Sequence, residues 1–362
     1  MDTSAEPLYT GVMALHQYLA EEVALDCAEG LLSRREAFRR LALLGLSAPA
    51  ATALLSACAS DSAPNSGRAA DSTTANASAT IATNASTTSP PTSQTATSQT
   101  PTTQTSTTQT STTETPTTET PTTETAQTTT TAALPQTEEI RFPGPEGELI
   151  GVLAVASDPQ GAVLVIHENR GLTAHIRTIP GRLAADGYTA LAIDLLSEEG
   201  GTAALPSEGD ATAALGNAPL ERMIADLRTG LDELQQRAPD APLAVIGFCF
   251  GGGMTWQLLA AGEPRLAAAV PFYGPTPPNP DFSGSPNAAV LGIYAERDDR
   301  VNASQGAAQA ALQAAGLVHE IRVFPGVDHA FFNDTSARYD LEQATAAYSA
   351  LLDWFAEHLA EV

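Results

Sequence analysis

The sequence predicts an α/β fold, with a mostly parallel, doubly wound sheet in a single domain that covers residues 136–362. In this region short continuous apolar runs alternate with longer segments of helical periodicity. Unbroken apolar runs are typical of strands that are buried on both faces of a parallel sheet. Residues 59–135 hold almost no apolar side chain to bury, so the folded part of the 362-residue chain is expected to begin near residue 136.

The expected strands follow one another from residue 139 onward. An opening pair is expected at residues 139–142 and 148–156. The others are the continuous apolar runs at residues 162–167, 189–195, 243–247, 267–272, 289–294 and 320–324.

Segments with helical periodicity separate these runs. They cover residues 175–186, 219–237, 252–261, 304–315 and 336–359. Pro219 suits the first turn of a helix, where an N–H donor is not needed. Gly187 and Gly262 stand where helices commonly end in a left-handed residue. The alternation of strands and helices therefore predicts a sheet with helices on both faces.

The first 57 residues have the features of an export signal. Residues 33–40 read Ser-Arg-Arg-Glu-Ala-Phe-Arg-Arg and precede an Ala- and Leu-rich apolar run, an order that resembles a twin-arginine signal. The run ends in Leu-Ser-Ala-Cys, which resembles the cleavage box of bacterial lipoproteins and makes Cys58 the expected lipidated residue. The protein is therefore expected on the outer face of the bacterial cytoplasmic membrane, held by this lipid alone. A short amphipathic helix with a chance Arg pair is the alternative, because the segment before the pair is long and acidic.

Residues 58–135 are expected to form a disordered stalk. From Gln99 onward a five-residue repeat of Thr, Pro and polar residues appears. Regularly spaced Pro favours an extended backbone, and the lack of apolar side chains leaves nothing to offset the entropy of ordering. An inert linker is the alternative interpretation.

The charge and the cysteines exclude several classes of partner. The chain has 42 acidic residues and 17 basic ones, all of them Arg, for a formal net charge of −25. Such a chain repels nucleic acid and anionic membrane surfaces. Cys27, Cys58 and Cys249 lack metal-ligand spacing, so no metal or other cofactor is expected. With Cys27 removed and Cys58 lipidated, Cys249 is the free thiol that remains, and hence a candidate nucleophile.

Cys249 lies at the centre of the most informative motif. Residues 245–253 read Val-Ile-Gly-Phe-Cys-Phe-Gly-Gly-Gly, between an expected strand and an expected helix. This is the form of the nucleophile elbow, G-x-S-x-G, with Cys in place of Ser. Gly247 and Gly251 leave room for a strained turn that lifts the sulfur to a helix N-terminus, where the helix dipole stabilises a thiolate. A structural turn with a buried Cys is the alternative.

The partners of such a nucleophile are expected later in the chain, the acid first and the His last. Asp298 and His329 each follow a predicted strand, in that order. An Asp would hold the imidazole in the required tautomer, and the His would take the thiol proton and later activate water. Asp298 is preferred because Val301 can anchor its loop in the core, and Asp299 remains the alternative.

A polar loop follows the first long apolar run and reads His167-Glu168-Asn169-Arg170-Gly. In folds with a nucleophile elbow this loop supplies the second amide of the oxyanion hole. The backbone N–H groups of Asn169 and Phe250 are therefore the expected donors. We expect His167 to be structural, and Glu168 to be either a contact of the sulfur or of an Arg, or an ordinary surface carboxylate.

Together these segments resemble the dienelactone hydrolase (carboxymethylenebutenolidase-like) family of α/β-hydrolases. The shared features are His-Glu-Asn-Arg-Gly, Gly-Phe-Cys-Phe-Gly-Gly, an Asp-x-x-Val loop and Gly-x-x-His-Ala-Phe, in order and spacing over residues 138–360. The resemblance implies the α/β-hydrolase fold and a triad of Cys249, His329 and Asp298. It also implies hydrolysis of a lactone or enol ester, with Glu168 as the acid that contacts the nucleophile.

One position departs from the pattern of this family. Its best-known members bind the substrate carboxylate through an Arg four residues after the His, where this chain has Asn333. Arg338 or Arg170 could take that role. The expected activity is therefore the cleavage of a small carboxylic ester or lactone through an acyl-thioester intermediate, without a commitment to carboxymethylenebutenolide.

Two other functions remain open at this stage. The fold could serve as a non-catalytic binding module on the cell surface, or the enzyme could act on peptides or polyesters. Three triad candidates in the expected order argue against the first alternative, since a scaffold has no need of them.

Overall fold

The computed structural model describes residues 5–61 and 135–359, and the side chains of residues 15–57 and 135–359. Contacts join the described parts of Met1–Pro64 and Ala132–Val362 into one unit. The stalk predicted at residues 58–135 lies outside the described residues, except at its two ends. The side chain of Cys58 also lies outside them, so its lipidation and the export of the protein stay predictions.

An eight-stranded sheet forms the centre of the molecule, in the order β1-β2-β4-β3-β5-β6-β7-β8. β2 pairs antiparallel with both β1 and β4, and all other neighbouring strands are parallel. The strands are β1 (Glu138–Pro143), β2 (Glu148–Ala154), β3 (Gly161–Ile166), β4 (Tyr188–Asp194), β5 (Leu243–Phe248), β6 (Leu266–Phe272), β7 (Ala289–Ala295) and β8 (His319–Phe324). The predicted mostly parallel sheet is confirmed, and every strand overlaps a segment that the sequence predicts as a strand.

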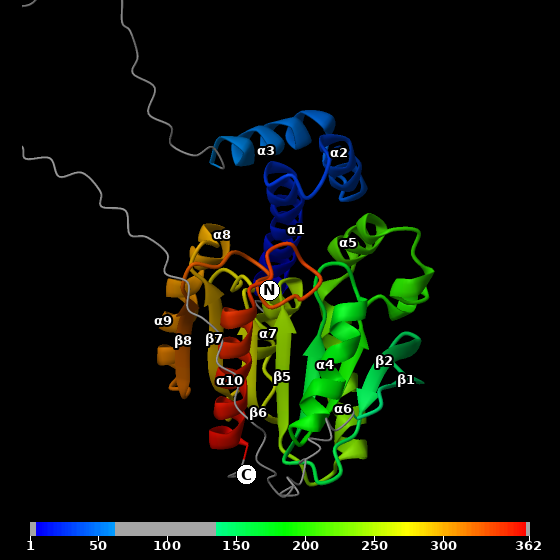
Figure 1. Cartoon of the computed structure of the whole chain (residues 1–362), viewed down its shortest axis with the longest axis vertical. Coiled ribbons are helices and arrows are strands. Elements are labelled where there is room, and N and C mark those ends of the chain that lie inside the picture. The colour runs from blue at the N-terminus through cyan, green and yellow to red at the C-terminus, as the bar shows by residue number, and fades with distance from the viewer. Residues whose placement is uncertain (1–4, 62–134, 360–362) are drawn as a thin grey trace, which may run out of the picture. The chain divides into compact units, whose positions relative to one another are not determined.

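Burial explains why the apolar runs are continuous. Every residue of β3, β4, β5, β6 and β7 is buried, because helices cover both faces of the sheet. α4 and α10 lie on one face, and α6 and α7 on the opposite face (Figure 1). Each buried Val, Leu or Ile side chain contributes about 1.5–3 kcal/mol of hydrophobic free energy. β8 is only half-buried over most of its length, as its outer edge has no neighbouring strand.

The five predicted helices are all present. They are α4 (Ala174–Ala185), α6 (Leu220–Arg237), α7 (Phe250–Ala260), α9 (Gln305–Ala315) and α10 (Leu341–His358). Gly187 and Gly262 follow helices with φ of 94° and 77°, as predicted. α10 begins at Leu341 instead of residue 336, because the Asp340 carboxylate accepts the N–H of Gln343 and caps the helix there.

Further short elements have no counterpart in the prediction. These are α5 (Glu208–Asn217), α8 (Asp299–Asn302) and two 3₁₀ turns, Ser197–Glu199 and Thr202–Ala204. They follow the ends of β4 and β7. α8 and the 3₁₀ turns are too short to show a helical period in the sequence, and α5 has Leu215 as its only large apolar side chain.

The segment predicted to be a signal also folds. It forms α1 (Ala5–Ala28), α2 (Arg34–Leu43) and α3 (Ala48–Asp61), and α1 lies at the carboxyl ends of the parallel strands (Figure 1). Leu19 and Ala24 of α1 are fully buried, and Arg39 of α2 pairs with Asp210 of α5 at 3.1 Å. Among the described helices, none has the length and hydropathy needed to span a bilayer.

Candidate active site

A sharp turn between β5 and α7 sets Cys249 at the carboxyl edge of the sheet. Its φ of 56° and ψ of −116° lie in a region that side-chain-bearing residues rarely adopt. The N–H of Cys249 donates to the Phe272 carbonyl of β6 at 3.1 Å, which helps to hold the strained residue. The sulfur therefore stands at the N-terminus of α7, where the helix dipole favours negative charge.

An aspartate and a histidine meet beside this turn. The Asp298 carboxylate, after β7, lies 2.5 Å through Oδ2 from Nδ1 of His329, after β8. Its other oxygen accepts the N–H of Val301 at 3.2 Å, and the Val301 side chain is fully buried. Asp299 is exposed. The geometry thus selects Asp298, and Val301 anchors its loop as the sequence predicts.

A tyrosine from α1 lies between the sulfur and the imidazole. The Tyr18 hydroxyl is 3.2 Å from Sγ of Cys249 and 3.4 Å from Nε2 of His329. On the same helix, Oε1 of Glu22 lies 3.7 Å from Nε2. Sγ of Cys249, a ring nitrogen of His329 and a Glu22 oxygen all lie within 4.8 Å of one another. The predicted site residues Cys249, Asp298 and His329 therefore come together, and α1 adds two more.

Sequence reasoning missed Tyr18 and Glu22. The one signal that could have pointed to them is the acidic segment before the Arg pair, which contains Glu22, Asp26 and Glu29. Such a segment is unusual in an export signal, and in the structure its carboxylates pair with arginines of the α/β domain.

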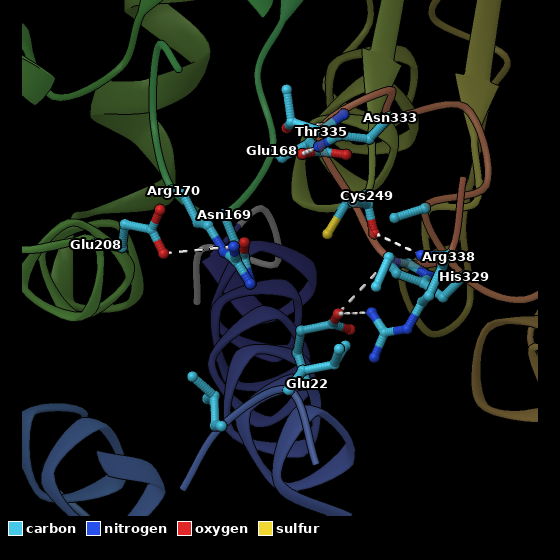
Figure 2. A pocket seen from close by; sticks show the side chains of 15 residues that line it. Glu22, Glu168, Asn169, Arg170, Glu208, Cys249, His329, Asn333, Thr335 and Arg338 are labelled. Carbon is cyan, nitrogen blue, oxygen red and sulfur yellow. Dashed lines mark hydrogen bonds and ion pairs between the residues drawn. The ribbon is translucent and has the colours of Figure 1, made fainter. Parts of the chain in front are cut away.

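A cavity of about 270 Å³ opens beside the sulfur. Figure 2 shows the sulfur of Cys249 pointing into the space between Asn169 and His329. The walls come from α1, from the loop after β3 and from the loop after β8, and they include Glu22, Leu32, Asn169, Arg170, His329 and Arg338. A substrate in this cavity would lie against both the sulfur and the imidazole.

Comparison with known proteins decides the family. The model of the "Dienelactone hydrolase family" matches residues 149–359, which is more than half of the chain. The chain belongs to the dienelactone hydrolase family. As a member it is a hydrolase of carboxylic esters or lactones.

Individual relatives agree with this assignment. A "Putative carboxymethylenebutenolidase" of Salmonella typhi is 35% identical over 210 residues, which cover 54% of this chain and 77% of that protein. One with the same name in Escherichia coli K12 is 33% identical over 214 residues, covering 55% and 78%. The crystal structure of a "Putative Dienelactone Hydrolase" from Klebsiella pneumoniae has a TM-score of 0.55 at 31% identity, and the match covers 61% of this chain and 98% of that one. The α/β-hydrolase fold is thereby confirmed.

The family resemblance implies that Glu168 contacts the sulfur of Cys249, but in this hydrolase its carboxylate bonds Asn333 instead. Its Oε2 accepts a hydrogen bond from the Asn333 amide at 2.6 Å (Figure 2), and its Oε1 is buried without a hydrogen-bond partner among the described residues. Asn333 stands where the best-known members have an Arg, and its neutral amide pairs with the carboxylate. The contact with the sulfur comes from Tyr18 instead.

The two arginines considered as carboxylate binders line the cavity but are already paired. Arg338 binds Asp26 at 2.8 Å and Glu29 at 2.7 Å. Arg170 binds Asp26 and Glu208, each at 3.3 Å. A substrate carboxylate would therefore have to compete with carboxylates of α1 for either guanidinium.

The expected oxyanion donors lie at the same edge of the sheet. Phe250 is the first residue of α7, so its N–H has no acceptor within the helix. Asn169 lines the cavity, and its carbonyl accepts the Thr212 hydroxyl at 2.9 Å, which fixes the loop. His167 behaves as a structural residue, because its ring nitrogens bond the Glu168 carbonyl at 2.7 Å and the Leu195 N–H at 3.1 Å.

Opposite charges surround the imidazole. Burial by itself would lower the pKa of His329, but the carboxylates of Glu22 and Asp298 raise that pKa well above its usual value. Burial would raise the pKa of Asp298, but the charge and the hydrogen bond of His329, together with the charge of Arg300 and the Val301 N–H, lower that pKa below its usual value. Burial, together with the nearby charges of Cys249 and Glu22, raises the pKa of Tyr18, so its hydroxyl keeps the proton. The site therefore stabilises the charged imidazole that forms when His329 takes up a proton.

We expect the stabilising effect of His329 to weaken as the pH rises. Its folded pKa lies above the unfolded value of about 6.5, so its charge stabilises the fold fully below that value and ceases to do so as the pH rises through the folded pKa. Thermal unfolding of the wild type and of His329→Gln, from about pH 5.5 to about pH 9.5, should show a Tm difference that narrows with rising pH. His319→Gln, at the opposite end of β8, is the control. A difference that widens with pH would contradict the charge assigned to His329.

Proposed function

We propose that this hydrolase cleaves a small carboxylic ester or lactone through an acyl-thioester on Cys249, with His329 as base and Asp298 as the orienting acid. One observation carries the proposal. The Asp298 carboxylate holds Nδ1 of His329 at 2.5 Å, so that Nε2 is turned toward a sulfur on a strained strand–helix turn. This is the arrangement that nucleophilic catalysis by Cys requires.

The proposed reaction has two halves. In the first, the proton of the thiol passes to Nε2 of His329 and Sγ attacks the carbonyl carbon, while the N–H groups of Asn169 and Phe250 bind the oxyanion. The carbon–oxygen bond then breaks, and His329 returns the proton to the leaving oxygen. In the second half, His329 takes a proton from water as the water oxygen attacks the thioester carbon. The carbon–sulfur bond then breaks, His329 returns the proton to Sγ, and the acid leaves. In a lactone the leaving oxygen stays on the product, which is a hydroxy acid.

The cavity indicates the class of substrate. A volume of about 270 Å³ admits a small molecule and argues against a folded peptide or a polyester chain. Leu31 and Leu32 give one apolar wall, and Arg170 and Arg338, both paired with carboxylates, give a polar one. We therefore favour a small lactone or ester, of the kind that the name carboxymethylenebutenolidase describes for the relatives.

A trapping experiment tests the covalent intermediate. We expect a panel of lactones and aryl esters to contain substrates, and acid quenching during turnover to leave the acyl group on the peptide that contains Cys249, detected by mass spectrometry. Alkylation of that thiol should abolish turnover, and bound substrate should slow the alkylation. Undiminished turnover after complete alkylation of Cys249 would rule the mechanism out.

A further inference from the structure

Tyr18 contacts both atoms between which the proposed mechanism moves a proton. Its hydroxyl lies 3.2 Å from Sγ of Cys249 and 3.4 Å from Nε2 of His329. Sγ and a ring nitrogen of His329 lie within 4.8 Å of each other, and in the described part of the chain no direct hydrogen bond joins the sulfur to the imidazole. The hydroxyl is therefore the hydrogen-bonded path from sulfur to imidazole.

The position of Tyr18 is not that of a plug in the substrate site. Cys249, His329 and Glu22 all line the cavity, whereas Tyr18 does not. Its side chain is 4% exposed and reaches the sulfur from within the packing of α1. A substrate that enters the cavity beside Asn169 can approach the sulfur without displacing the tyrosine.

Charged residues hold the hydroxyl in place. The guanidinium of Arg300 lies over the Tyr18 ring, 4.3 Å from its centroid, and donates to the Tyr18 backbone carbonyl at 3.4 Å. Glu22, one helical turn further along α1, forms ion pairs with Arg300 and Arg338. Asp26, one more turn along, binds Arg338 at 2.8 Å. α1 is thus fixed to the hydrolytic domain by side chains on the face that carries Tyr18.

We propose that Tyr18 is a catalytic residue that relays the proton between Cys249 and His329. As the S–H bond breaks, its proton forms a bond to the Tyr18 oxygen, while the original O–H bond breaks and that proton forms the N–H bond on Nε2. The products are a thiolate, an imidazolium and an unchanged tyrosine, whose new O–H donates to the thiolate. Because burial disfavours the phenolate, the two transfers are concerted. The inference rests on the proposed function of Cys249.

The relay has a consequence for the N-terminal segment. The active protein must retain α1, whereas processing directly before Cys58 would remove that helix from the chain. The folded hydrolase then consists of the N-terminal helices together with the α/β domain. The lipoprotein prediction requires that residues 1–57 are removed, whereas the relay requires that they are kept.

Tyr18→Phe in the full chain tests the relay. The variant keeps the ring against Arg300 and removes only the hydroxyl. We expect kcat for an ester substrate to fall by about 10- to 100-fold, with KM and Tm little changed, and the rate of thiol alkylation at Cys249 to fall over the neutral pH range. An unchanged kcat overturns the relay. A rise in kcat or in the alkylation rate also overturns it, since that result is expected when a plug is removed.

A matched variant and a reference variant make the result unambiguous. Tyr273→Phe removes a hydroxyl from another buried tyrosine, whose ring centroid lies 5.1 Å from that of His329 and whose hydroxyl has no hydrogen-bond partner among the described residues. We expect it to keep wild-type kcat.

Cys249→Ala separates the two proposals: if it is inactive while Tyr18→Phe is fully active, the relay alone is wrong. If Cys249→Ala is active, the proposed function is wrong, and the relay with it.

Discussion

Replacement of Cys249 by Ala is expected to lower kcat/KM for an activated ester by about 10³- to 10⁶-fold. The sulfur is the atom that forms the proposed acyl-enzyme, and it stands on the strained turn at the N-terminus of α7. The oxyanion amides and the cavity remain in the variant, so a small residual rate over water is expected. The free energy of unfolding should change by only about 1 kcal/mol, because Cys249 and Ala are similar in size and the backbone strain is common to both.

Steady-state kinetics and denaturant unfolding of the same preparations measure the two effects. Cys27→Ala is the matched control, since Cys27 is also a free thiol, half-buried on α1. It should keep wild-type kinetics and should remain sensitive to thiol alkylation. Wild-type turnover by Cys249→Ala would show that a group other than Cys249 is the nucleophile.

Replacement of Gly247 by Ala should have the largest effect on stability. A Cβ at this position would lie 2.0 Å from the carbonyl oxygen of Gly251 and 2.3 Å from its carbonyl carbon. Both are backbone atoms of α7, so they cannot yield unless the helix moves away from β5. We expect a loss of about 3 kcal/mol or more in the free energy of unfolding, with a matching loss of activity as the turn at Cys249 is displaced.

Urea unfolding at equilibrium measures this loss. Gly306→Ala is the control, because Gly306 lies within α9 and a Cβ there meets no atom within 4 Å. That variant should be as stable as the wild type or more stable by up to about 1 kcal/mol, as Ala favours the helix. A Gly247→Ala protein with the wild-type midpoint would mean that β5 and α7 can separate at little cost.

Local patterns predicted most of the fold because the parallel sheet is buried on both faces. The strands β3 to β7 are continuous apolar runs in the sequence for that reason. α8 escaped prediction because it is too short to repeat an apolar period, and α5 because Leu215 is its only large apolar side chain. α8 exists because the Asp298 carboxylate caps it through the N–H of Val301, and a cap of that kind is visible only once the loop is folded.

The site was predictable for a related reason. The carboxyl ends of parallel strands meet at one edge of a sheet, so residues that follow β5, β7 and β8 come to lie at the same edge of that sheet. Cys249, Asp298 and His329 each follow one of them. The choice between Asp298 and Asp299 needed the structure. The two residues are adjacent, but the Asp298 carboxylate bonds the imidazole of His329 whereas Asp299 is exposed to solvent.

The strands, the strained turn at Cys249 and the order of Asp298 and His329 could all be predicted from the sequence, since each depends on a few adjacent residues and the backbone they allow. What lies against the sulfur depends on the tertiary structure. Tyr18 precedes Cys249 by 231 positions, and no local pattern in α1 encodes its partner. The contact between Tyr18 and Cys249 depends on the ion pairs of Glu22 with Arg300 and of Asp26 with Arg338. These charged groups lie far apart in the sequence and meet only in the folded protein.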